Sequence, residues 1–137
     1  MSNLNLNHSL QSEQMLIYLP TVDSSKSSTF KVVEQNGFNI SYVDGTGSTG
    51  DYFEDTFSIS GSTLHSFEMG LATDSSISVG IMGIGYNSSE ANVDSGNGTV
   101  YANLPQALQN GGLIKANAYS LWLNDLRKPP STILQFE

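Results

Sequence analysis

The stretch that decides the fold of this chain is Phe38-Asn-Ile-Ser-Tyr-Val-Asp-Gly-Thr-Gly-Ser-Thr-Gly-Asp-Tyr-Phe-Glu-Asp-Thr-Phe-Ser-Ile59. Apolar and polar residues alternate over positions 38–42, which is typical of a half-buried β-strand. Asp44-Gly45 and Gly47 then allow the backbone conformations that the tip of a tight hairpin needs. On the return, Asp55 shares a row with apolar residues at alternate positions: Phe53, Phe57 and Ile59. The sequence therefore predicts a long β-hairpin with a glycine-rich tip.

Five stretches resemble the pepsin-like aspartic proteases, especially the fungal secreted branch. Residues 40–51, Ile-Ser-Tyr-Val-Asp-Gly-Thr-Gly-Ser-Thr-Gly-Asp, look like the active-site flap of that family. The other four follow the family's order: Val22-Asp-Ser-Ser-Lys-Ser-Ser-Thr-Phe30, Gly80-Ile-Met-Gly-Ile-Gly-Tyr86, Leu104-Pro-Gln-Ala-Leu-Gln-Asn-Gly-Gly-Leu-Ile114 and Asn117-Ala-Tyr-Ser-Leu-Trp-Leu-Asn-Asp125. The resemblance implies an all-β fold, an incomplete N-terminal lobe of a pepsin-like protease with one or two short helices.

The chain divides into three parts by this resemblance. Residues 1–21 are an unrelated, poorly ordered lead-in that could hold a short strand at Met15–Leu19. Residues 22–126 form the partial protease lobe, and residues 127–137 are a divergent tail with a strand at Thr132–Phe136. Besides the hairpin, the patterns predict strands at Thr29–Val33, Leu64–Leu71, Val79–Tyr86 and about 118–123, a polar loop at Thr73–Ser78, and a helix at Leu104–Asn110.

The catalytic residues of the family are two aspartates, each in an Asp-Thr-Gly or Asp-Ser-Gly loop, one per lobe. The pair shares one proton, because two carboxylates so close together cannot both ionise. This chain contains one such tripeptide, Asp94-Ser95-Gly96, with Asn92 before it and Asn97-Gly98 after it. A solvated turn fits that context better than a buried catalytic loop. We therefore expect no catalytic residue here, and a truncated chain that lacks both loops and is inactive alone.

Four positions match substrate-contacting residues of the family. Tyr42 corresponds to the flap tyrosine that closes over the substrate and lines the first specificity pocket. Asp44 and Gly45 correspond to flap positions that contact the substrate backbone, and Ile81 to a second residue of the pocket. Each also has a structural interpretation: Tyr42 as a buried hairpin tyrosine, Asp44 as a turn former, and Ile81 as core.

Three functions are compatible with these observations. The first is membership of the aspartic endopeptidases, which hydrolyse peptide bonds with an aspartate-activated water; its partner would be a peptide or protein substrate. The second is a non-catalytic pseudoprotease that binds peptides or protease inhibitors. The third is an unrelated β-rich binding module, such as a carbohydrate binder, although five ordered motifs make coincidence a poor explanation.

The net charge and residue composition exclude several classes of binding partner. A net charge of -8 argues against nucleic acid and anionic membrane surfaces. The sequence has no cysteine and two well-separated histidines, so neither a metal nor a cofactor is expected. An unpaired Val79–Tyr86 strand would expose an edge for self-association.

Localisation follows from the resemblance, which implies an extracellular or vacuolar protein. No export signal is evident near the N-terminus: residues 1–7 lack basic residues, and the apolar run at 15–19 is short. Four glycosylation sequons are present and would matter only in a secreted protein: Asn7-His-Ser, Asn39-Ile-Ser, Asn87-Ser-Ser and Asn97-Gly-Thr.

Overall fold

The computed structural model describes residues 4–5, 22–90, 100–122 and 133–136. The strand predicted at Met15–Leu19 and the tripeptide Asp94-Ser95-Gly96 lie outside these residues. The division of the chain at residues 22 and 126 stays a prediction.

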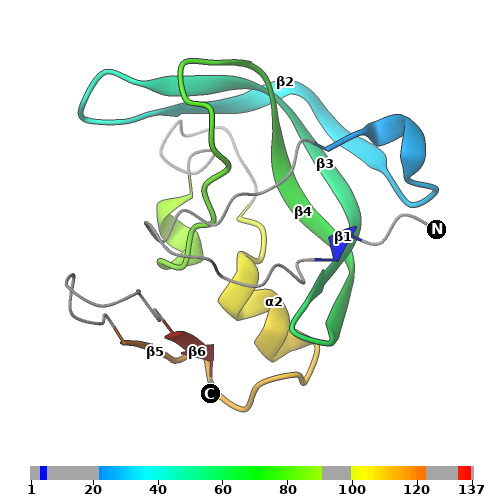
Figure 1. Ribbon diagram of the computed structural model, residues 1–137, viewed down its shortest axis with the longest axis vertical. Helices are drawn as coiled ribbons and strands as arrows, with labels where there is room; N and C mark the ends of the chain where they lie inside the picture. Colours follow the sequence, from blue (N-terminus) through cyan, green and yellow to red (C-terminus); the bar gives the residue numbers. More distant parts are fainter. Residues whose placement is uncertain (1–3, 6–21, 91–99, 123–132, 137) are drawn as a thin grey trace.

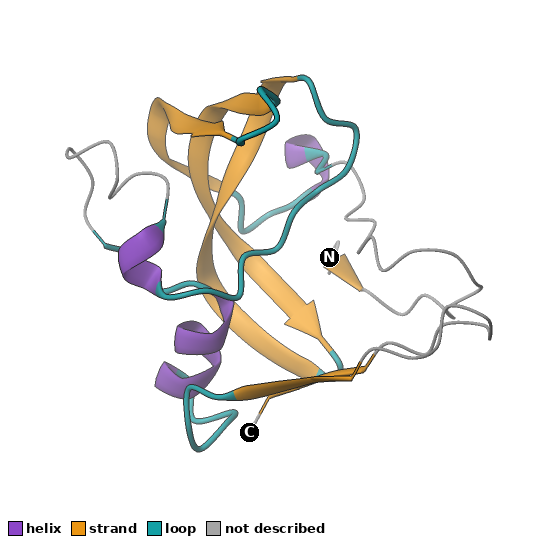
Figure 2. Cartoon of the chain, turned by 90° about the vertical axis from the view of Figure 1, so that its left-hand side faces the viewer, coloured by secondary structure: helices purple, strands orange, loops and turns teal. Residues whose placement is uncertain are grey.

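A twisted sheet organised around one long central strand dominates the described fold (Figures 1 and 2). The central strand β3 (Gly47–Ile59) pairs antiparallel with β2 (Lys31–Ser41) on one side and with β4 (Ser62–Ser75) on the other. A two-residue strand, β1 (Leu4–Asn5), pairs parallel with the end of β3 and was not expected from the sequence. The all-β class with little helix is thus confirmed.

The remaining elements are short. A 3₁₀ turn η1 (Ser24–Lys26) precedes the sheet, and η2 (Asn87–Ser89) and the helix α2 (Leu104–Asn110) follow it. A second, two-stranded sheet pairs β5 (Tyr119–Trp122) with β6 (Ile133–Phe136). Helix α2 lies below the main sheet in Figure 1. The strands predicted near 118–123 and at Thr132–Phe136 are confirmed, each slightly shorter than expected.

Local sequence explains both ends of α2. The side-chain oxygen of Asn103 accepts a hydrogen bond from the Gln106 N–H at 3.4 Å, and Pro105 lies in the first turn, where its missing N–H costs nothing. At the other end Gly112 has φ = 68°, the left-handed conformation that stops a helix and favours glycine. The predicted helix is confirmed with its predicted bounds.

The core forms where α2 packs against β3 and β4. Its buried residues are Phe57, Leu64, Leu104 and Leu108, surrounded by the half-buried Ile59, Phe67, Met69, Met82, Ala107 and Ile114. Leu64 and Phe67 reach the same side despite their odd spacing, because the register shifts between Asp55↔Phe67 and Phe57↔Leu64. Ser66, inside this bulge, has φ = 49°. The bulge aims both side chains at the helix.

Asp55 is the buried carboxylate of the sheet, with only 3% of its surface exposed. It accepts hydrogen bonds from Ser27 Oγ at 2.8 Å, from Thr29 Oγ1, and from the Thr56 N–H at 2.7 Å. Burial alone would raise the pKa of this carboxyl, but the three donors together outweigh it and lower the pKa. Asp55 therefore attaches the segment before β2 to the central strand.

Three predictions about elements were wrong. No strand forms at Val79–Tyr86, because no described strand runs beside it to supply a hydrogen-bonding ladder; the exposed edge expected there is absent with it. The loop at Thr73–Ser78 begins later, since β4 continues to Ser75 opposite Ser48. The strand at Thr29–Val33 and the first arm of the hairpin are one strand, β2, with register shifts between Val32 and Phe38.

Candidate functional site

The hairpin tip between β2 and β3 is closed by hydrogen bonds within five residues. The Tyr42 N–H donates to the Thr46 carbonyl at 2.8 Å, and the Gly45 N–H donates to the Tyr42 carbonyl at 3.0 Å. Asp44 accepts from the Thr46 hydroxyl at 2.7 Å and the Thr46 N–H at 2.9 Å. These two donors, the hydroxyl first, lower the pKa of Asp44. The carboxylate thus organises the turn, as the structural interpretation of Asp44 predicted.

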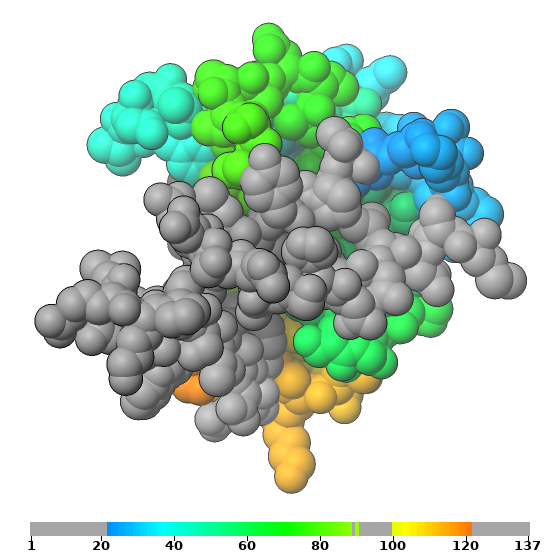
Figure 3. Space-filling view, viewed as in Figure 1, coloured from blue at the N-terminus to red at the C-terminus, as the bar shows by residue number. Residues whose placement is uncertain are grey.

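Two glycines fit the tip for different reasons. Gly45 has φ = 84°, which a residue with a side chain adopts only at a cost. Gly47 packs so closely on β2 that an added Cβ would lie 2.5 Å from the Ile40 carbonyl oxygen. The tip therefore keeps a narrow, tightly paired shape. Its residues stand out from the rest of the surface at the upper left of Figure 3.

Tyr42 is half-buried at the base of this tip, whereas its neighbour Val43 is fully exposed. Partial burial raises the pKa of the Tyr42 phenol, so the ring stays neutral. The structure gathers Tyr42, Asp44 and Gly45, three of the four residues singled out in the sequence, at one protruding turn.

A set of hydroxyl contacts, here termed the serine clasp (Gly47, Ser48, Ser75 and Ser76), joins the root of the tip to the end of β4. The Gly47 N–H donates to Ser76 Oγ at 2.8 Å, and Ser76 Oγ donates to the Gly47 carbonyl at 3.0 Å. The Ser76 N–H also donates to that carbonyl at 3.0 Å. The hydroxyls of Ser48 and Ser75 are 2.7 Å apart. The clasp fixes the point at which the tip leaves the sheet.

Ile81, the fourth residue singled out, belongs to the irregular segment that continues from the serine clasp. Its side chain is 56% exposed, so the core interpretation is wrong; the neighbouring Met82 packs on the core instead. The buried Asn103 holds this segment through a hydrogen bond from its Nδ2 to the Gly85 carbonyl at 2.7 Å. The same side chain caps α2, so the helix and the segment share one anchor.

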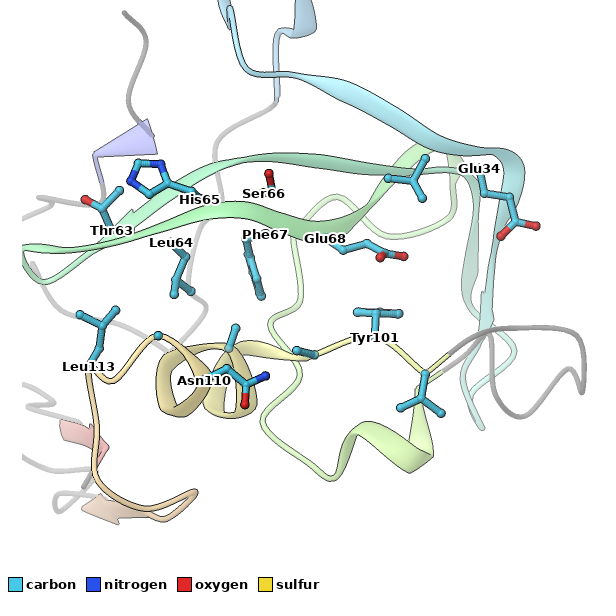
Figure 4. Close-up of a pocket in the computed structure, with 15 residues that line it drawn as sticks. Glu34, Thr63, Leu64, His65, Ser66, Phe67, Glu68, Tyr101, Asn110 and Leu113 are labelled. Carbon is cyan, nitrogen blue, oxygen red and sulfur yellow. The ribbon is translucent and has the colours of Figure 1, made fainter.

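Sequence reasoning missed a cavity of about 970 Å³ between the sheet and α2 (Figure 4). Glu34 of β2, Glu68 of β4 and Tyr101 are among the residues that line it. Leu64 and Phe67 point from β4 toward the helix in Figure 4, and Glu68 points along the sheet to the side where Glu34 and Tyr101 lie, whereas His65 points away from the helix. No local pattern reveals this cavity, because its walls come from segments far apart in the sequence.

Glu68 is an acidic residue in the wall of this cavity, and two other glutamates, Glu54 and Glu34, lie near it. It pairs across the strands with Glu54, and burial, followed by the charges of Glu54 and Glu34, raises the pKa of its carboxyl. On the far side, Tyr101 donates its hydroxyl to Glu90 at 3.0 Å, and burial raises the pKa of that phenol. The cavity wall therefore carries a carboxyl that gives up its proton less readily than an exposed glutamate does.

Replacing Glu68 with glutamine is expected to stabilise the chain at neutral pH. The pKa of Glu68 is higher in the folded chain than its ordinary value of 4.5. Below pH 4.5 Glu68 therefore does not reduce the free energy of unfolding, but it does so as the pH rises through the folded-state pKa and the carboxyl ionises. The melting temperature of Glu68→Gln should thus exceed that of the parent by on the order of 2 °C at pH 7 and match it at acid pH. Asp74→Asn, which removes a charge from the exposed end of the same strand, is the control. An equal rise in melting temperature in Glu68→Gln and Asp74→Asn would show that the effect comes from the change in net charge alone.

Replacing Ser76 with alanine is expected to loosen the tip without unfolding the sheet. The Gly47 N–H loses its hydroxyl acceptor, a loss of about 1 kcal/mol, which corresponds to roughly fivefold faster local opening. Hydrogen exchange of the amides from Tyr42 to Gly47 measures it, with Ser76→Thr retaining the hydroxyl. Equal acceleration throughout β3 would contradict a local role for the clasp.

Comparison with known proteins identifies the class. The sequence profile of the family described as "Eukaryotic aspartyl protease" matches residues 6–135, and the chain therefore belongs to this family of pepsin-like proteases. It is 49% identical over 114 residues to a "Probable aspartic-type endopeptidase OPSB" of Arthroderma benhamiae, covering 83% of this chain and 23% of that protein. The "Acid protease" of Saccharomycopsis fibuligera is 40% identical over 114 residues, covering 83% and 29%. The "Secreted aspartic protease 3" of Candida albicans is 36% identical over 117 residues, covering 85% and 27%.

The chain thus spans about a quarter of the length of these relatives. Within the residues that the structure describes, no group of three histidine or acidic side chains is placed to hold a metal ion. No helix in the same residues is long and apolar enough to cross a membrane.

Proposed function

We propose that this protein acts as an aspartic endopeptidase and that the chain supplies the flap that closes over the substrate. One observation carries the proposal: the β2–β3 hairpin ends in a protruding turn that holds Tyr42, Asp44 and Gly45 together. The identity of 49% to a probable aspartic-type endopeptidase supports it. The substrate is an extended peptide or protein segment.

The four residues have distinct roles in this proposal. Tyr42 places a neutral ring against the substrate side chain next to the cleaved bond, which suits a half-buried aromatic anchor. Asp44, held by Thr46, and Gly45, which has no side chain, leave the turn backbone open to hydrogen bonds from an extended peptide. Ile81, exposed on the segment beyond the serine clasp, adds apolar surface to the same pocket.

The chemistry needs two carboxylates that share a proton, one as base for the attacking water and the other as acid toward the substrate carbonyl. We infer that these 137 residues contain neither. Asp94-Ser95-Gly96 is the one Asp-Ser-Gly tripeptide in the sequence, and polar turn residues surround it. The chain alone therefore supplies the flap without the catalytic pair.

The 137-residue chain by itself is expected to hydrolyse no peptide bonds at any pH between about 3 and 7, because it lacks the carboxylate pair. Release of acid-soluble peptides from a denatured protein substrate measures this. The control is Asp94→Asn, which should leave the background unchanged. Turnover that Asp94→Asn abolishes would make Asp94 catalytic and overturn the assignment.

We propose an extracellular destination, in keeping with the name of the Candida albicans relative, "Secreted aspartic protease 3". Self-association is also proposed, now through the outer edge of β2, since the described sheet places β3 on its other side. Sedimentation velocity at rising concentration would detect it; a constant monomer mass would exclude it.

A further inference from the structure

Asn39 lies on the outer strand of the flap hairpin, within the sequon Asn39-Ile40-Ser41. Exposure alternates along this stretch: Asn39, Ser41 and Val43 are exposed, whereas Phe38, Ile40 and Tyr42 are half-buried. Phe38 makes an edge-on contact with Tyr52, whose ring centroid is 5.5 Å away. Because successive strand residues point to opposite faces, the Asn39 side chain points away from these aromatic rings.

The strand also leaves space beside Asn39. Its backbone partner is Thr49 of β3, itself exposed, and no described strand covers the other edge of β2. The other sequon within the described residues is less open. Asn87 is half-buried, and its carbonyl accepts the Glu90 N–H at 3.4 Å as the 3₁₀ turn η2 closes.

We propose that Asn39 is an acceptor for an N-linked glycan. This inference rests on the extracellular destination proposed above, because a chain must enter the secretory pathway to meet the glycan donor, a lipid diphosphate-linked oligosaccharide. The side-chain nitrogen of Asn39 attacks the anomeric carbon of the sugar. The new C–N bond replaces the bond to the diphosphate, which leaves with the lipid, and the nitrogen loses one proton.

A glycan at this position is compatible with the proposed flap and useful to it. It projects from the face opposite Phe38, Ile40 and Tyr42, so the substrate side of the hairpin stays clear. It also stands beside the edge of β2 that no described strand pairs, so a bulky polar group there restricts the self-association proposed above to chains without the glycan. The modification therefore protects the most exposed strand of the sheet.

The test places the 137-residue chain behind a cleavable secretory leader in a eukaryotic host. The leader brings the chain to the donor, so a failure reflects Asn39 itself and not the proposed destination or the peptidase function. Protein from microsomes and medium is treated with a glycan-removing amidase in heavy-oxygen water. Peptide mass spectrometry then measures the labelled aspartate that a removed glycan leaves at residue 39.

The expected result is that most of the Asn39 peptide carries the label. Ser41→Ala should abolish the label and Ser41→Thr should retain it, because the sequon needs a hydroxyl residue there. Thr49→Ala, which changes the cross-strand neighbour without altering the sequon, should also retain it. An unlabelled Asn39 in the parent chain would overturn the proposal, whatever the occupancy of the other three sequons. A label that survives Ser41→Ala would overturn it as well.

Discussion

Replacing Asp55 with alanine is expected to lower the free energy of unfolding by about 3 kcal/mol. The carboxylate is 3% exposed and accepts from three donors: the Ser27 hydroxyl, the Thr29 hydroxyl and the Thr56 N–H. Alanine leaves these three donors without their shared acceptor. Chemical denaturation at neutral pH measures the loss.

The pH dependence distinguishes this mechanism from simple cavity formation. The folded-state pKa of Asp55 lies below its ordinary value of 3.8, so its stabilisation is present above that value and fades as the pH falls through the folded one. The difference in free energy of unfolding between the parent and Asp55→Ala should therefore become smaller in strong acid. Ser27→Ala, which removes one of the three donors, should lower the free energy of unfolding by about 1 kcal/mol. A difference in free energy of unfolding that stays constant with pH would contradict the proposed role of the Asp55 negative charge.

Local sequence patterns predicted the elements whose causes are local. The hairpin followed from alternation and from Asp44-Gly45, whose turn geometry needs a positive φ that Gly45 adopts at 84°. The helix followed from Pro105 in its first turn and Gly111-Gly112 after its end, and its bounds agree with the prediction; the Asn103 cap was not foreseen. Asp55 was placed correctly in the buried row, although nothing in the sequence named its partners 26 and 28 residues away.

Features that depend on distant partners escaped prediction. The Val79–Tyr86 segment has the apolar and glycine-rich composition of a buried strand, but composition does not supply a neighbouring strand. The bulge that turns Leu64 toward α2 depends on the pairing of β3 with β4. The cavity beside Glu68 and the serine clasp likewise join residues from separate strands. Of the candidate site, the tip was predictable and its attachment was not.

Replacing Tyr42 with alanine is expected to lower kcat/KM at least about tenfold in the catalytically competent protein, in keeping with loss of an aromatic anchor. The ring is half-buried at the base of the tip, and Asp44 and Gly45 keep the turn in place around it. Tyr42→Phe keeps the ring and loses the hydroxyl, so it should retain activity within about threefold of the parent. Alanine at the fully exposed Val43 is the neighbouring control and should have little effect.

The most direct test measures kcat/KM for an extended peptide at acid pH. It uses the catalytically competent protein in which this chain supplies the flap beside the two catalytic aspartates, and the Tyr42→Ala variant of that protein. We expect acid-dependent cleavage by the parent protein and at least a roughly tenfold loss of kcat/KM in the variant at unchanged melting temperature. Absence of cleavage by the parent protein would contradict the endopeptidase assignment. Equal kcat/KM in the parent and the variant would show that the β2–β3 tip does not close over the substrate.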